Sequence, residues 1–268
     1  IRDNKAQAGL VLTAEYSDLW KEDKKTETNE VMFALQHSAK HKIASNYGKS
    51  YYPSDYSPNA GWADYYGNED FLKAYPNDDR KEWNYMTEWK IKSGEIIPYT
   101  ESADKLPAIS KYYDYDEGAP GKSAQSNGIT CIYRYAEVLL MYAEASTRAT
   151  NSVNQDALNA IQEVQKRAGY QDRQIELTTT TEPTAFLAAV SNERGWEFFA
   201  EMKRWFELVR LEKVKEVRAE EWDASTFNTN HHYYFPVPYQ QVDLAGWILI
   251  YHKTSNLIFI INNLINRP

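Results

Sequence analysis

Cysteine is nearly absent from this sequence of 268 residues, which contains Cys131 and no other. A single cysteine excludes an internal disulfide and any metal site that needs several thiolates. Cys131 directly precedes an apolar, helix-like stretch, and we interpret it as a small buried residue.

Long hydrophobic runs are also missing. The opening residues, Ile-Arg-Asp-Asn-Lys, are polar apart from Ile1 and lack a hydrophobic region, so we do not expect a signal peptide at this point of the sequence. Near the other end, residues 248–250 and 257–261 form two short apolar bursts with polar residues between them. These bursts are too short and too interrupted to span a bilayer.

Basic residues are outnumbered by acidic ones, and the formal net charge is −8. The overall field therefore repels nucleic acid and anionic membrane surfaces, whereas a neutral ligand is not affected. The motif G-x-S-x-G, the Walker loop and the dinucleotide fingerprint are all absent. The sequence thus gives no basis for a nucleotide cofactor, a nucleophilic serine site or a nucleic-acid partner.

Metal-ligand patterns are weak. His37 and His41 have a metal-compatible spacing if helical, but residues 31–36 read as a strand and no third ligand is near. The two adjacent histidines at residues 231–232 are an equally weak indication of a metal site. The acidic residues between positions 55 and 64 lack the regular spacing of a calcium loop. We therefore predict neither a metal nor a cofactor.

Aromatic residues are abundant, at 14% of the chain, and they gather in residues 47–89 among many Gly, Pro, Asp and Asn residues. So many turn-forming residues predict long irregular loops rather than a helix. Aromatic rings displayed from loops offer broad, stiff apolar faces for recognition. A sugar ring has C–H faces and a rim of hydroxyls, so a sugar site needs such rings beside carboxylates or amides.

Residues 47–66 supply both kinds of group. We predict ligand contacts by Tyr47, Tyr51, Tyr52, Trp62, Tyr65 and Tyr66, and by the polar side chains of Asp55, Asn59 and Asp64. Trp62 is the first choice because N-A-G-W-A-D places it after a predicted turn and beside Asp64. The alternative is that these rings fill a local core that holds the loop down. Exposure of Trp62 and Tyr65 to solvent would decide against that alternative.

Two further groups of residues in the loop region are assigned lesser roles. One group could contact a ligand as a second choice, although the simpler interpretation is a solvated acidic loop. It consists of Tyr112, Tyr113, Asp114, Tyr115, Asp116 and Glu117. Residues expected to serve packing and salt bridges are Tyr75, Asp78, Asp79, Arg80, Trp83 and Trp89.

Helical patterns dominate the second half. Residues 132–145 contain no Gly or Pro and carry an apolar stripe at Ala136, Leu140 and Ala143, which predicts a packed helix. On this predicted helix Arg134 and Glu137 are three residues apart, and Glu144 precedes Arg148 by four.

Two more helices follow. The second runs from Asn154, a good N-cap, to position 166 or 167, and Gly169 stands where a left-handed C-cap is common. The third begins near Pro183.

The third helix leads into a charged block at residues 193–210. If the helix is continuous, Glu193, Glu197 and Arg204 lie in line with apolar positions, so we expect them to be buried and paired. Acids one helical turn apart also suit a glycosidase. However, the interleaved Arg and Lys residues would keep them ionised, whereas a general acid needs a raised pKa. Gly195 costs about 1 kcal/mol relative to Ala inside a helix and favours a kink.

Four blocks, in order, resemble the SusD/RagB family of surface lipoproteins, which capture nutrients for an outer-membrane transporter. They are R-Y-A-E-V-L-L-M-Y-A-E-A at residues 134–145, L-N-A-I-Q-E-V-Q-K-R-A-G at 158–169, E-R-x-x-E-x-x-x-E-x-x-R-W-F-E-L-V-R at 193–210 and F-P-V-P at 235–238. The resemblance implies a mainly α fold of tetratricopeptide-type helix pairs with long irregular loops and a few short strands. Residues 1–244 would be the C-terminal part of such a domain, with an aromatic loop region at about 30–130 and helices at about 131–215.

The resemblance also implies a function. The expected activity is non-catalytic capture of a glycan, an oligo- or polysaccharide, at the outer membrane for import through a SusC-like TonB-dependent transporter. The membrane would be reached only through a lipid anchor outside this chain, on a first half that carries the export signal. A peptide ligand within the same family is one alternative, and a carbohydrate-active hydrolase is another.

Residues 245–268 depart from the family, which usually closes with a phrase rich in Asn and Pro. Our hypothesis is that the sequence after Leu244 results from an altered reading frame or a boundary artefact. A coding sequence and a mass spectrum that show a native, in-frame tail would refute it. An ordered tail should pack on the helices. A disordered one would expose two apolar bursts that favour aggregation.

Overall fold

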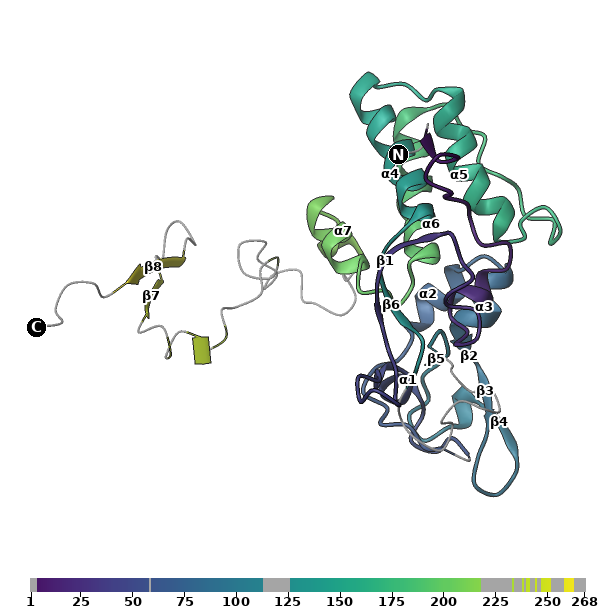
Figure 1. The fold of residues 1–268 in the computed structure, drawn as a ribbon, viewed down its shortest axis with the longest axis vertical. Coiled ribbons are helices and arrows are strands. Elements are labelled where there is room, and N and C mark those ends of the chain that lie inside the picture. The colour runs from purple at the N-terminus through teal and green to yellow at the C-terminus, as the bar shows by residue number, and fades with distance from the viewer. Residues whose placement is uncertain are drawn as a thin grey trace, which may run out of the picture. The chain divides into compact units, whose positions relative to one another are not determined.

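Helices α4 (Tyr135–Thr150), α5 (Gln155–Arg167) and α6 (Pro183–Glu197) form the main packed body of the chain (Figure 1). The computed structural model describes residues 4–57, 59–112 and 126–217, with 233, 238, 240–241, 244, 247–251 and 258–262. The chain divides into two compact units, Ile1–Arg204 and Trp205–Pro268. A short connection makes α4 and α5 a helix pair, as expected for antiparallel neighbours.

The apolar stripe predicted on α4 lies in the core of the first unit. Ala136, Leu140 and Ala143 are fully buried and pack in one hydrophobic cluster with residues from α5 and α6. The predicted mainly α architecture is confirmed, as is the burial of Cys131.

The ends of the helices follow the local signals in the sequence. The Asn154 side chain accepts a hydrogen bond from Ala157 N at 2.8 Å and caps α5, as predicted. Gly169 has φ +82°, the left-handed conformation expected just after that helix. Pro183 opens α6, and the Glu182 side chain caps it.

The predicted start of the first helix at residue 132 is wrong, because Ile132 to Arg134 belong to strand β6 (Ile129–Arg134). β6 pairs antiparallel with β1 (Val31–Gln36), a strand that the sequence did predict. Branched and aromatic residues favour the strand, and the β1 backbone supplies its hydrogen-bond partners. Arg134 therefore does not share a helix face with Glu137.

The loop region contains more regular structure than predicted. Short helices occur there at α1 (Tyr47–Tyr51), α2 (Glu69–Ala74), α3 (Asp79–Asn84) and η3 (Tyr99–Glu101), and a further one, η2 (Tyr16–Leu19), precedes the region. Side chains of Asn68 and Asp78 cap α2 and α3, which explains how such short helices form among turn residues. The expectation of irregular loops alone over residues 47–89 is thus wrong.

Two small antiparallel ladders complete this region. Strand β2 (Tyr85–Met86) pairs with β5 (Ala108–Ile109), and β3 (Glu88–Lys90) pairs with β4 (Ile96–Pro98). Residues 91–95 form the turn of a hairpin whose first strand is β3.

The charged block at residues 193–210 is not one helix, contrary to the prediction. α6 ends at Glu197, residues 198–203 form turns, and α7 (Arg204–Arg210) begins afterwards. Ala200 and Met202 have positive φ values, which no helix contains. Gly195 stays inside α6, and a Cβ there would meet the Arg204 guanidinium carbon at 3.2 Å. The glycine thus provides room for Arg204, and the chain leaves the helix three residues later.

The second unit contains α8 (Val214–Val217) and the antiparallel pair β7 (Trp247–Tyr251) and β8 (Ile258–Asn262). The F-P-V-P block at residues 235–238 lies almost wholly outside the described residues. The packing of the tail on the helices and its altered reading frame stay predictions. None of the helices in the described part of the chain is long and apolar enough to cross a membrane.

Candidate functional site

The loop at residues 61–65 is pinned through its backbone to the end of α1. Trp62 N donates to Lys49 O at 2.8 Å, and Asp64 N and Tyr65 N donate to Ser50 O at 2.9 and 3.2 Å. The amides of residues 61 and 63 donate to the carbonyls of residues 53 and 52, at 2.8 and 3.0 Å. The last carbonyls of a helix lack helical partners, so the loop satisfies groups that would otherwise need water.

Backbone conformation at two positions shows how closely this loop is held. A Cβ at Gly61 would lie 1.9 Å from Tyr52 O, so only glycine fits there without movement. Ala63 has φ +57°, a left-handed conformation that is uncommon for a residue with a side chain. Strain of this kind persists only where the surroundings fix the chain, and it gathers at functional sites. The loop is therefore preorganised.

Gly61→Ala should displace this loop. Because the new methyl group would clash with backbone rather than with a flexible side chain, we expect the free energy of unfolding to fall by about 1–3 kcal/mol. Urea unfolding followed by circular dichroism measures the change. Ala60→Gly alters the adjacent, exposed residue and is the matched control, with an expected effect within about 0.5 kcal/mol. A Gly61→Ala variant as stable as the wild type would contradict the tight approach.

The pinned loop presents two rings to solvent. Trp62 is 50% exposed and Tyr65 is 60% exposed, which argues against a purely structural role for these two residues. The Lys49 ammonium lies 5.2 Å from the centre of the Trp62 ring, within range of a cation–π contact. Tyr65 rests on Tyr51, with ring centres 5.6 Å apart. Asp64, between the two rings in sequence, is exposed.

A ladder of aromatic rings supports Tyr65 from beneath. Tyr51 stacks on Tyr112 at 5.8 Å with an interplanar angle of 14°, and Trp20 meets Tyr112 edge-on at 5.7 Å. Burial raises the pKa of Tyr51 to about 12, and the neighbouring tyrosines contribute to the shift. The ladder therefore connects the exposed ring of Tyr65 to the hydrophobic core, which restricts its movement.

Other predicted ligand contacts are placed differently. Tyr51 is 7% exposed and Tyr52 is 1% exposed, so neither offers an open ring face, and their burial argues against direct ligand contact, which stays a prediction. The pattern Y-Y at the end of a short helix does not reveal that both rings turn inward. Tyr47 is partly buried and packs on Tyr112 at 5.3 Å.

Among the predicted polar contacts, Asp55 is engaged within the protein. Its carboxylate accepts hydrogen bonds from Trp89 Nε1 at 2.8 Å and from Ala103 N at 3.0 Å. Asn59 and Tyr66 are partly buried. Burial and the nearby Asp104 carboxylate raise the pKa of Tyr66. Asp64 is therefore the predicted polar residue best placed beside the exposed rings.

A set of charged side chains, here called the buried ionic cluster, lies in the interior of the first unit. It consists of Glu30, Asp78, Arg80, Lys111, Arg134, Arg167, Glu193, Glu197 and Glu201. Every one of these side chains is less than 5% exposed. Elements far apart in sequence meet in this cluster.

Arg134 lies at the centre of the buried ionic cluster. Its guanidinium donates to Glu30 at 2.7 Å and to Glu201 at 2.9 Å, and it also binds Glu197. Arg80 similarly pairs with Glu193 at 2.6 Å. The predicted burial and pairing of Glu193 and Glu197 are confirmed. Arg204 is partly buried and donates to Ser191 O.

Arg134 and Glu137, three residues apart on the predicted helix, do not pair, because strand β6 places Arg134 in the buried ionic cluster. Glu137 instead accepts a hydrogen bond from Lys203 at 2.5 Å. The predicted pair on α4, Glu144 with Arg148, is present at 2.8 Å.

The carboxylates of the buried ionic cluster do not form a glycosidase site. Burial alone would raise the pKa of Glu197, but the guanidiniums of Arg167 and Arg134 outweigh it and hold that pKa well below its usual range. Burial raises the pKa of Glu193 by more than the Arg80 guanidinium lowers it, so the pKa of Glu193 lies above its usual value. However, the Glu193 side chain is fully enclosed, so no substrate can reach it. A raised pKa without access serves no general acid.

Lys111 makes the stability of the cluster dependent on pH. Burial outweighs the neighbouring Glu201 carboxylate and lowers the pKa of Lys111 to about 8, from the model-peptide value of 10.5. Between these values the unfolded chain binds more protons than the folded chain. The contribution of Lys111 to the free energy of unfolding should therefore rise with pH, by about 2 kcal/mol between pH 7.5 and 9.5. Well below pH 8, where the folded and unfolded chains both hold the proton, the contribution stays at its minimum.

Urea unfolding of the wild type and Lys111→Met across pH 7.5–9.5 tests this dependence. The difference between the two isolates Lys111 from buried tyrosines and Cys131, whose raised pKa values act in the opposite direction. Parallel pH profiles for the two proteins would show that Lys111 titrates alike in the folded and unfolded chains.

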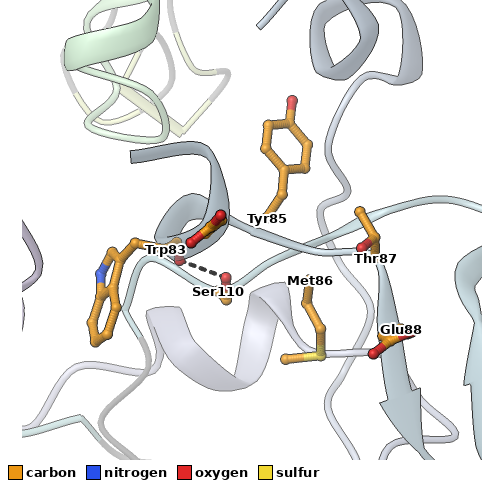
Figure 2. A pocket seen from close by; sticks show the side chains of 7 residues that line it. Trp83, Tyr85, Met86, Thr87, Glu88 and Ser110 are labelled. Carbon is orange, nitrogen blue, oxygen red and sulfur yellow. Dashed lines mark hydrogen bonds between the residues drawn. The ribbon is translucent and has the colours of Figure 1, made fainter. Parts of the chain in front are cut away.

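A hollow beside α3 was not anticipated from the sequence. It has a volume of about 330 Å³ and lies where α3 passes into β2, with Ser110 on the adjacent segment that follows β5 (Figure 2). Trp83 and Tyr85, two positions apart, point in different directions (Figure 2). Both line the hollow, and Tyr85 is otherwise buried in a hydrophobic cluster. Trp83 was expected only to pack.

The expected packing and salt bridges are otherwise present at Asp78, Arg80 and Trp89. The second-choice contacts at residues 113–117 lie outside the described residues, and Tyr112 is buried. Among the residues that the structure describes, no group of three or more His, Cys, Asp or Glu side chains is placed to hold a metal ion.

Comparison with known proteins gives a family match. A model of the SusD family matches residues 29–248. SusD-like protein P2 from Formosa agariphila is 26% identical over 258 residues, covering 88% of this chain and 50% of that protein. SusD-like protein P25 from the same organism is 26% identical over 194 residues, covering 70% and 34%. The chain thus spans half, or less, of the length of these curated relatives.

Solved structures share the fold. A SusD homolog from Bacteroides thetaiotaomicron matches with a TM-score of 0.72 at 20% identity, covering 90% of this chain and 56% of that chain. Surface glycan-binding protein A from the same organism, in complex with laminarihexaose, matches with a TM-score of 0.66 at 22% identity, covering 93% and 55%. At these identities the likeness shows the fold alone.

Proposed function

We propose that this chain, which belongs to the SusD family, captures a glycan by stacking sugar rings on Trp62 and Tyr65. The observation that carries the proposal is the pinned loop at residues 61–65, which holds two exposed rings and the carboxylate of Asp64 in place before any ligand arrives. A preorganised site loses little conformational entropy on binding, so more of the contact energy appears as affinity.

A neutral glycan fits this site best. The ring faces of Trp62 and Tyr65 suit the C–H faces of a pyranose, and Asp64 can accept hydrogen bonds from its hydroxyls. The net charge of −8 disfavours a polyanionic ligand. The laminarihexaose bound to one structural neighbour adds support for the ligand class. A peptide ligand is the main competing outcome.

Capture without turnover is part of the proposal. The paired acids most suggestive of a glycosidase, Glu193, Glu197 and Glu201, lie inside the buried ionic cluster and not on a surface that a substrate reaches. Family membership further supports placement at the cell surface of the outer membrane and delivery of the glycan to a SusC-like TonB-dependent transporter. That transporter and a lipid anchor outside this chain complete the proposed assembly.

The experiment is electrophoresis of the protein through gels that contain single polysaccharides, neutral and anionic, followed by calorimetry with matching oligosaccharides. Retardation by a neutral polysaccharide, with no shorter products in chromatography after long incubation, is the expected result. Release of shorter sugars would overturn the non-catalytic assignment. Binding of peptides alone would replace the ligand class while leaving the site to be tested by Trp62→Ala.

A further inference from the structure

Two hollows adjoin at Trp83, on the face formed by α3 and β2. The larger has a volume of about 330 Å³ and the smaller about 220 Å³, and both are lined by Glu82 and Trp83. The larger is within the range of about 300–1,000 Å³ typical of small-molecule sites. None of the residues that line either hollow belongs to the segment 47–66 that carries the Trp62 loop.

Trp83 is held in a fixed orientation. Its indole Nε1 donates to Lys111 O at 3.3 Å, and its own carbonyl accepts a hydrogen bond from Ser110 Oγ at 2.6 Å (Figure 2). The Lys21 ammonium lies 5.8 Å from the ring centre and is itself paired with Asp18 at 2.7 Å. The indole remains partly exposed. A ligand therefore meets an apolar surface that is already ordered.

The larger hollow also offers polar groups to a ligand. Thr87 and Glu88 are exposed side chains at its rim, and Met86 adds a partly exposed apolar surface (Figure 2). The Glu82 carboxylate is paired with Arg173 at 2.7 Å, so its charge is largely balanced. Apolar surface next to a hydroxyl and carboxylate acceptors matches the amphipathic ring of a sugar.

We infer that the hollow at Trp83 is a second glycan subsite, which takes one pyranose unit of a neutral glycan separately from the Trp62 loop. The inference rests on the proposed function, because it assigns the same class of ligand. The sugar C–H face contacts Trp83 and Met86, and its hydroxyls donate to Glu88 and Thr87. Two subsites on one chain bind a long polysaccharide more tightly than either does alone, since the second contact forms within one complex.

The test is isothermal titration calorimetry with neutral hexasaccharides, starting with laminarihexaose, on the wild type, Trp62→Ala, Trp83→Ala and the double variant. We expect two binding events in the wild type, one in each single variant and none in the double variant. Retardation by the matching polysaccharide should fall at least about threefold in Trp83→Ala. One event in the wild type, unchanged in Trp83→Ala, would overturn the second subsite and leave the first intact.

Trp83 also packs beside the core, so a second variant avoids unfolding. Thr87→Arg places a long side chain into the hollow from an exposed position and should likewise remove one event. Thr100→Arg, at an exposed position that lines neither hollow, is the matched control and should keep both. Two events in Thr87→Arg would count against the subsite, and absence of binding in every protein would overturn both proposals together.

Discussion

Trp62→Ala should weaken glycan binding about 10- to 100-fold while leaving stability close to that of the wild type. Trp62 is half exposed, so its removal opens no buried cavity. The indole face is the largest apolar surface on the pinned loop, and losing it costs about 1.5–3 kcal/mol of binding free energy. Calorimetry with the oligosaccharide identified by gel retardation measures the loss, and urea unfolding measures stability.

Tyr133→Ala is the matched control for Trp62→Ala. Tyr133 is 56% exposed on β6 and has the Lys203 ammonium 5.3 Å from its ring centre, an environment like that of Trp62 beside Lys49. Its removal should leave glycan affinity unchanged. Equal losses in the two variants would indicate a non-specific role of exposed rings. Undiminished binding in Trp62→Ala would move the site away from the loop at residues 61–65.

Arg134→Met should lower the free energy of unfolding by about 3–5 kcal/mol, the largest expected loss of stability for one substitution. Met fills much of the same volume but leaves the carboxylates of Glu30, Glu197 and Glu201 buried with fewer cations. Burial of an uncompensated charge costs far more than the loss of an ion pair in water. Urea unfolding at pH 7 measures the change.

Arg148→Met is the control for Arg134→Met. Arg148 also pairs with a carboxylate, that of Glu144 on α4, but its side chain is half exposed to solvent. We expect an effect of about 0.5 kcal/mol or less. If Arg134→Met fails to fold, Arg134→Lys can be measured instead. Lysine keeps the positive charge but lacks the planar set of guanidinium N–H donors, so this variant should still be clearly destabilised. Comparable stability of the Arg134 and Arg148 variants would show that the buried ionic cluster contributes little.

Local signals in the sequence predicted much of the helical body. The stripe at Ala136, Leu140 and Ala143 lies in the core, and Asn154 and Gly169 mark the two ends of α5. These signals succeed because helix periodicity and capping depend on residues three or four positions apart. The aromatic composition of residues 47–66 likewise pointed to Trp62 and Tyr65, which are both exposed.

Long-range contacts decided what the local pattern left open. Arg134 reads as a helix residue, yet pairing of β6 with β1 places it against Glu30, which is 104 positions away. Tyr51 and Tyr52 read as possible ligand contacts, yet packing turns both inward. The break after Glu197 follows from turns at residues 198–203 that carry no Gly or Pro.

By itself, then, the sequence determined the mainly α class, the SusD family and the aromatic segment that carries the proposed site. Only the tertiary structure decided which rings face solvent, how the buried charges pair, and that Trp83 borders a hollow. The reason is physical. Periodicity and caps act within one or two turns of chain, whereas exposure, ion pairing and cavities depend on segments that meet only after the chain has folded.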